Sequence, residues 1–101
     1  MPYFTLSYDV VPNFIDRRTP FREAHLQKVR AAREHGQLVM AGALGVPPDG
    51  ALLVFRGESA SIAEDFARAD PYVHEGLVTS WRVRPWAVVV GGDAEPPGAP
   101  R

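Results

Sequence analysis

Hydrophobic and polar residues alternate at the start of the chain, in the pattern of a strand with one buried face. From Phe4 onward, apolar side chains occupy every second position and polar side chains lie between them. Successive side chains of a strand point to opposite faces of a sheet. We therefore predict a half-buried strand from Tyr3 to Val10. Its apolar face carries Phe4, Leu6 and Tyr8.

The next pattern is helical and carries a signal at each end. After a short loop, Thr19 followed by Pro20 predicts an N-cap with proline in the first helical position. Gly36 predicts that the helix ends after His35. The pattern therefore predicts a first helix of about 16 residues.

A hairpin and a second helix follow. Two apolar runs, at residues 38–44 and 51–55, lie on either side of a turn rich in Gly and Pro and predict a β-hairpin. Ser61 and Glu64 have the spacing of a capping box and predict the start of a second helix. That helix must end shortly before Pro71, because the residue before a proline is disfavoured in the α conformation.

The last apolar run, at residues 77–90, is rich in Val and Trp and predicts a long strand. It contains Pro85, which has no N–H to donate to a neighbouring strand, so the run suits an edge position. Residues 91–101 hold mainly Gly, Pro and Ala and predict a disordered tail. The domain is therefore expected to span residues 1–90.

The predicted order is β-α-β-β-α-β, which defines an α+β, ferredoxin-like fold. Right-handed crossovers place both helices on one face of a four-stranded antiparallel sheet. A chain of 101 residues has no further element to cover the other face. We therefore expect a homodimer in which a second copy packs against that face.

Composition and charge narrow the classes of function. The chain has 11 Lys and Arg against 12 Asp and Glu, so its net charge of -1 gives no basic footprint for nucleic acid or an anionic membrane. It has no cysteine, which removes disulfides, thiol catalysis and cysteine-bound metal. Its first residues read as a strand without a targeting pattern, so we expect a cytoplasmic protein.

Two ionisable residues occupy helix positions that face the predicted core. His25 shares a helical face with Phe21 and Val29, and Asp70 leans toward the same side of its helix as Phe66. If they meet beneath the helices, the carboxylate would hold one imidazole nitrogen and leave the other as a general base. The alternative is a core histidine bonded to a backbone carbonyl and an aspartate that only ends a helix.

Three arginines, Arg17, Arg18 and Arg22, surround the start of the first helix, where cations are normally disfavoured. A helix N-terminus with added guanidinium groups is a suitable receptor for a small anion, and Arg22 and Arg18 are the predicted substrate-binding residues. The alternative is a set of solvated arginines paired with Asp16 and Glu23.

Asp9, at the end of the first strand, is a second candidate partner for His25 or a polar wall of the same cleft. The alternation of the strand places it on the face opposite the apolar residues, so it is the second choice. His35 and His74 fall in loop or helix-end positions and are expected to be solvated. These histidines have no paired ligand spacing, so we expect neither a metal nor a cofactor.

Four short segments, in order, resemble the motifs of the YCII family, and the resemblance covers roughly residues 3–88. The matching segments are Arg22–Leu26 (R-x-x-H-L), Gly36 with Ala41–Leu44, Asp70–Tyr72 with Gly76 and Leu77, and Val83–Trp86. The chain departs from the family at Ala43, where proline is common. This puts only the details of the strand exit in question.

The resemblance implies a dimeric α/β barrel related in shape to muconolactone isomerase, with a site at the positions of His25 and Asp70. It also implies elimination or isomerisation of small cyclic or aromatic-derived acids. Our first hypothesis is a cofactor-free lyase or isomerase in which His25 moves a proton, Asp70 orients it and Arg22 binds a small anionic substrate. The alternative is a non-catalytic module that binds a small ligand or a protein partner.

Overall fold

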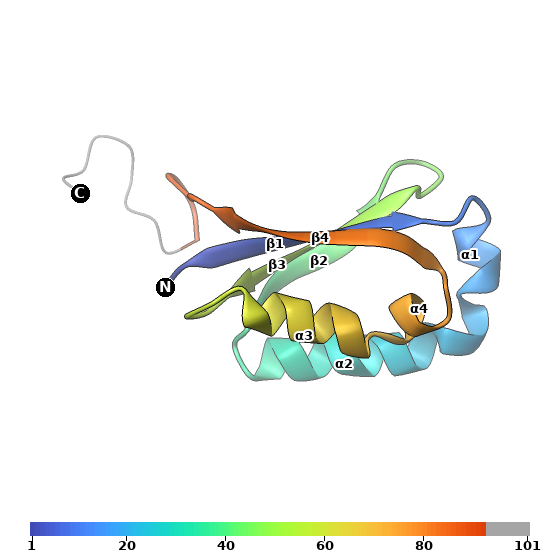
Figure 1. Ribbon diagram of the computed structural model, residues 1–101, viewed down its shortest axis with the longest axis horizontal. Coiled ribbons are helices and arrows are strands. Elements are labelled where there is room, and N and C mark those ends of the chain that lie inside the picture. Colours follow the sequence, from blue (N-terminus) through green and yellow to red (C-terminus); the bar gives the residue numbers. More distant parts are fainter. Residues whose placement is uncertain (93–101) are drawn as a thin grey trace.

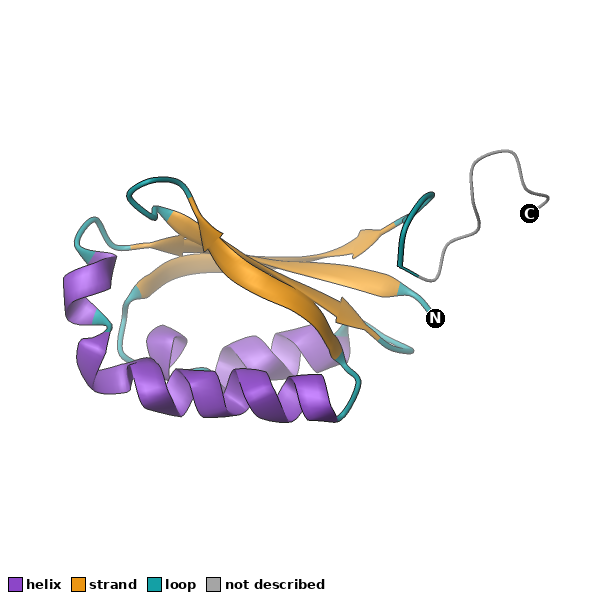
Figure 2. Cartoon of the chain, turned by 180° about the vertical axis from the view of Figure 1, so that it is seen from behind, coloured by secondary structure: helices purple, strands orange, loops and turns teal. Residues whose placement is uncertain are grey.

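The computed structural model describes residues 1–92, and the rest of the predicted tail lies outside the described residues. Its sheet is antiparallel and four-stranded, in the order β2-β3-β1-β4. All of the helices lie on one face of this sheet (Figures 1 and 2). The elements are β1 (Tyr3–Val10), α1 (Phe14–Arg17), η1 (Thr19–Phe21), α2 (Arg22–Glu34), β2 (Leu38–Leu44), β3 (Gly50–Arg56), α3 (Ser61–Ala69), α4 (Pro71–His74) and β4 (Val78–Trp86). The predicted α+β ferredoxin-like fold is confirmed.

The alternation of β1 decides which side chains enter the core. Leu6 is opposite Leu53 on β3 and Val83 on β4, so the three side chains share the face that the helices cover. Leu6 has no exposed surface, and Leu53 is almost fully buried. The core therefore lies between this sheet face and the helices, with β1 in a central position of the sheet.

The approach to the first long helix differs from the prediction. The segment after β1 forms the short helix α1, because Phe14 turns into the core and is 5% exposed. Thr19 begins the 3-10 turn η1, so it does not cap an α-helix, and no side-chain hydrogen bond caps α2. The predicted end of the helix is correct, since Gly36 follows it with a φ of 75°, a conformation that glycine adopts without strain.

Two further boundaries differ from the prediction. Ala60, which offers no side-chain acceptor, is the N-cap of α3, so Ser61 and Glu64 form no capping box. The last strand ends at Trp86, well before Val90, although β4 is at the edge of the sheet as Pro85 predicted. Sequence patterns located both elements, but not the N-cap residue of α3 or the end of β4.

No helix among residues 1–92 covers the second face of the sheet. Leu44 is paired with Gly50, Met40 with Val54 and Trp86 with Tyr3, and by alternation these positions lie opposite the core face. Met40 is 64% exposed, and Leu44 and Trp86 are each 47% exposed. The face therefore carries an apolar surface, and the homodimer stays a prediction. No helix among residues 1–92 is long and apolar enough to cross a membrane.

Replacing Leu6 with alanine is expected to lower the free energy of unfolding by about 2–5 kcal/mol, because a buried leucine is lost and a cavity remains. Ser7→Ala, one residue along on the other sheet face, is the matched control and should cost less than about 1 kcal/mol. Urea unfolding of the two variants measures both values. Equal losses in the two variants would contradict the assigned faces of β1.

Candidate active site

Asp70 lies at the junction of α3 and α4, where the following proline decides its backbone. Its φ of -72° and ψ of 125° are extended, as expected of a residue before proline, so α3 ends there. The side chain then caps the next turn by accepting a hydrogen bond from the backbone N–H of Tyr72, at 3.0 Å. Asp70 is completely buried.

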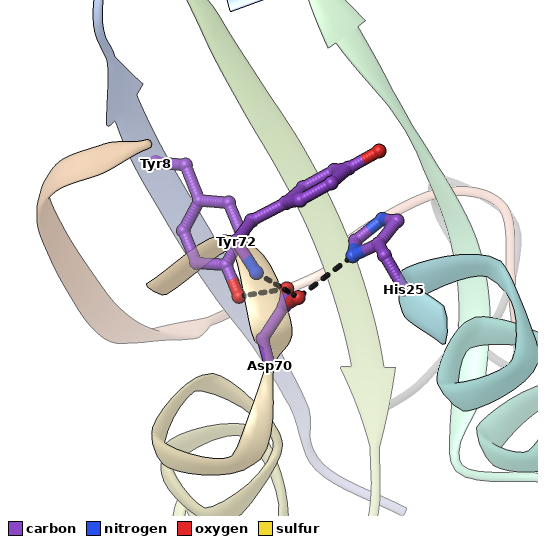
Figure 3. A network of polar contacts seen from close by, with 4 residues as sticks. All are labelled: Tyr8, His25, Asp70 and Tyr72. Atoms are coloured by element: carbon purple, nitrogen blue, oxygen red, sulfur yellow. Dashed lines mark hydrogen bonds and ion pairs between the residues drawn. The ribbon is translucent and has the colours of Figure 1, made fainter. Parts of the chain in front are cut away.

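Two more donors reach the same carboxylate from other parts of the fold. The hydroxyl of Tyr8, on β1, donates to Oδ2 at 2.7 Å. Nδ1 of His25, on α2, lies 2.8 Å from Oδ1. Figure 3 shows the three contacts converging on Asp70. A buried carboxylate is costly unless its oxygens are hydrogen-bonded, and here they accept from three elements.

These contacts define the tautomer of His25. The Asp70 oxygens face donors, and a carboxylate can only accept hydrogen bonds, so we assign the imidazole proton to Nδ1. The lone pair of the neutral ring then lies on Nε2, which has no hydrogen-bond partner among residues 1–92. Nε2 is therefore free to accept a proton.

The plane of the imidazole is held by aromatic contacts. The ring of Tyr72 stacks on His25 with 4.0 Å between centroids and 13° between planes. The rings of Phe14 and Tyr72 pack edge to face, with 5.3 Å between centroids and 86° between planes. Because the side chain of His25 is only 14% exposed, these contacts leave the imidazole little freedom to rotate.

His25 borders a cavity of about 420 Å³ between α1, α2 and the core face of β2 and β3. The size lies within the range of roughly 300–1,000 Å³ that is typical of small-molecule sites. Small side chains on β2 and β3 form part of its wall, and both predicted substrate-binding arginines border it. The lining includes Tyr8, Phe14, Arg18, Arg22, His25, Ala41, Ala43, Ala51, Leu53 and Tyr72.

The structure separates the two predicted aspartates. Asp70 contacts His25, whereas Asp9 is exposed and accepts a hydrogen bond from the Ser80 hydroxyl at 2.7 Å. Asp9 does not border the cavity, because the alternation of β1 turns it to the other sheet face. The structure therefore places Asp9 away from both His25 and the cavity. His35 and His74 are exposed, as predicted.

The two tyrosines of the site are held in their protonated forms. Burial raises the pKa of the Tyr8 hydroxyl far above its ordinary value, and the charge and hydrogen bond of Asp70 raise it further. Burial also raises the pKa of Tyr72, although the positive charges of Arg22 and Arg18 offset part of this effect. At neutral pH both hydroxyls therefore carry their proton and can donate a hydrogen bond; Tyr8 donates to Asp70.

Sequence reasoning missed Tyr8 and Tyr72 as members of the site. Alternation placed Tyr8 on the core face, and a buried tyrosine hydroxyl usually needs a hydrogen-bond partner, which was the available signal. Tyr72 was visible only as part of a short motif after Asp70. Among residues 1–92 no cluster of three or more His, Asp or Glu side chains is arranged to hold a metal ion.

The fold and the site together define a small ferredoxin-like α+β protein in which a partly buried imidazole is paired with a fully buried carboxylate at the wall of a cavity. Residues 1–87 match the YCII-related domain, and the chain belongs to this family. A similar protein is an uncharacterized protein of Haemophilus influenzae, 26% identical over 96 residues that cover 86% of this chain and 98% of the relative.

A solved structure with a similar fold is that of 5-chloro-2-hydroxyhydroquinone dehydrochlorinase (TftG) from Burkholderia phenoliruptrix AC1100, in complex with 2,5-dihydroxybenzoquinone. The TM-score is 0.68 and the sequences are 20% identical, over 83% of this chain and 92% of TftG. At this identity the likeness establishes the shared fold alone.

The raised pKa of Tyr8 predicts a loss of stability at high pH. Above about pH 10 the tyrosine ionises in the unfolded chain, whereas Tyr8 stays protonated in the folded protein, so unfolding becomes more favourable as the pH rises. We expect Tyr8→Phe to be less stable at pH 8, by about 1–3 kcal/mol, because Asp70 loses a donor.

The same variant should lose less further stability between about pH 10 and 11 than the wild-type protein does. Urea unfolding across this range measures both slopes. Tyr72 also has a raised pKa, so part of the slope should remain in Tyr8→Phe. Parallel curves for the two proteins would contradict a special role of Tyr8.

Proposed function

We propose that the chain is a small cofactor-free enzyme of the lyase or isomerase type, with His25 as general base and acid. The observation that carries this proposal is the geometry of His25: Nδ1 is bound to a fully buried carboxylate while Nε2 is free beside the cavity. This arrangement suits a histidine that acts as a general base, because one ring nitrogen is anchored and the other is free to take a proton.

In the proposed reaction, Nε2 of His25 removes a proton from the substrate and the resulting imidazolium lies next to the Asp70 carboxylate. The 2.8 Å contact supports this role, because an adjacent negative charge stabilises the positive ring. Return of the proton to another atom gives isomerisation, and loss of a leaving group gives elimination. Tyr8 and the backbone of Tyr72 keep Asp70 in place during the transfer.

The expected substrate is a small anion. Arg18 and Arg22 border the cavity, and guanidinium groups bind carboxylates and other oxyanions well. The similar fold of TftG, a dehydrochlorinase solved with a dihydroxybenzoquinone, supports an oxygen-rich ring as substrate and elimination as the reaction. Removal of HCl from such a ring requires a base, which is the role we assign to His25.

Replacing His25 with glutamine tests the proposal. Glutamine can still donate to Asp70 but cannot take up a proton, so we expect turnover to fall by about 10²-fold or more with the fold intact. Turnover is measured on a panel of small hydroxylated aromatic compounds, with and without chloride as a leaving group. His35→Gln is the control, because His35 lies at the exposed end of α2 and bonds a backbone carbonyl.

Full turnover in His25→Gln would contradict the proposed base. The alternative, a non-catalytic binding module, is favoured if no compound of the panel is converted and thermal melts show that His25 and Asp70 act as a structural pair. In that case His25→Ala and Asp70→Asn should each cost about 1–3 kcal/mol, because each leaves a buried polar partner unsatisfied.

We further propose a homodimer formed by the uncovered sheet face. Its exposed apolar side chains, Met40, Leu44 and Trp86, support this arrangement, because a monomer would leave them in water. The double substitution Met40→Asp with Leu44→Asp should shift the protein to monomer in sedimentation experiments, whereas Gln27→Glu on α2 should not. A monomeric wild-type protein at micromolar concentration would contradict the proposal.

A further inference from the structure

Tyr72 has a feature that its packing role does not explain. The residue is 4% exposed, and its hydroxyl oxygen is buried without a hydrogen-bond partner among residues 1–92. Buried polar groups are nearly always satisfied, because an unpaired one has lost its hydrogen bonds to water without replacement. A phenylalanine would make the same ring contacts without this cost.

The ring is fixed, so the hydroxyl cannot turn away to find a partner. One face stacks on His25 at 4.0 Å, and Phe14 packs against it edge-on. The backbone N–H of Tyr72 is bound to Asp70. In Figure 3 the hydroxyl lies at the end of the ring that points away from Asp70. The phenol oxygen is therefore held in one position at the wall of the cavity.

The charges beside this hydroxyl are positive. Arg22 and Arg18 border the same cavity, and their positive charges lower the pKa of Tyr72 against the larger effect of burial. A guanidinium group can only donate hydrogen bonds. Neither arginine can therefore accept the proton of the Tyr72 hydroxyl.

We propose that Tyr72 is a substrate-binding residue whose hydroxyl, together with the guanidinium of Arg22, binds one negatively charged oxygen of a planar substrate. An oxyanion in this place accepts from both donors and satisfies the buried phenol. This inference rests on the proposed function of His25. The oxyanion would lie within the cavity that His25 borders, on the side of the imidazole that faces away from Asp70. Such binding narrows the substrate class to anions that present a negatively charged oxygen to this part of the cavity, such as phenolates and enolates.

The free protein must adjust slightly to bind such an anion. The phenol oxygen is covered in the absence of ligand. Arg22 is exposed and occupies the first turn of α2, so its side chain can move while the backbone stays in place. The two donors then meet the ligand oxygen from different sides.

Two probes of similar shape test the inference: 4-nitrophenolate, which carries an oxyanion, and 4-nitroanisole, in which the oxygen is methylated and neutral. Their dissociation constants are measured from the shifts of the His25 ring resonances, above the pKa of the nitrophenol. We expect the wild-type protein to prefer the phenolate. Tyr72→Phe should weaken phenolate binding about tenfold or more, the effect of one hydrogen bond to a charged group, and leave the anisole unchanged.

Tyr3→Phe, on the other face of the sheet, is the matched control and should change neither constant. Tyr72→Phe should also keep the wild-type His25 resonances and melt at the wild-type temperature or above it, since the ring and the backbone bond to Asp70 remain and the unpaired hydroxyl is removed. The inference is wrong if the wild-type protein binds neither probe or shows no preference. It is also wrong if Tyr72→Phe binds both probes as the wild type does or weakens both equally.

These outcomes are separate from those of the proposed function. A loss of phenolate preference in Tyr72→Phe would support the binding role even if His25→Gln kept full turnover. An unchanged preference would remove the role of Tyr72 and leave the His25 base to be judged by its own variant.

Discussion

The buried carboxylate of Asp70 is the interaction on which the rest of this structure depends. None of its surface reaches water, so its oxygens must find their donors inside the protein. They find them on β1, α2 and α4, through Tyr8, His25 and the backbone of Tyr72. Each donor belongs to a different element, so satisfying one side chain ties the central strand to the helices. A shift of any of these elements would leave a buried charge with fewer partners.

The same constraint organises the candidate site. The proline after Asp70 ends α3, and the Asp70 carboxylate caps α4 by accepting a hydrogen bond from the backbone N–H of Tyr72. The ring of the same Tyr72 stacks on His25. The imidazole is thus anchored by a hydrogen bond at Nδ1 and by a ring on its face, with Nε2 left free beside the cavity. Stability and proposed chemistry depend on one network, so changes at its members affect both.

The two faces of the sheet have different roles. The core face holds the hydrophobic cluster and, where β2 carries only small side chains such as Ala41 and Ala43, leaves room for the cavity. The other face carries exposed Met40, Leu44 and Trp86 and is the surface through which we propose that two copies pair. The chain shares the YCII-related domain with its family and the overall fold with TftG, and a shared fold does not by itself define a substrate.

The sequence alone determined the elements whose signals are local: the alternation of Tyr3–Val10, the helix end at Gly36, the hairpin, and the edge position of the strand with Pro85. It also brought His25 and Asp70 forward as a pair. Only the tertiary structure excluded Asp9, formed α1 by burying Phe14, and joined Tyr8 to Asp70, 62 positions along the chain. The physical reason is that periodicity and turn chemistry act within a few residues, whereas the partner of a buried polar group depends on which elements pack together.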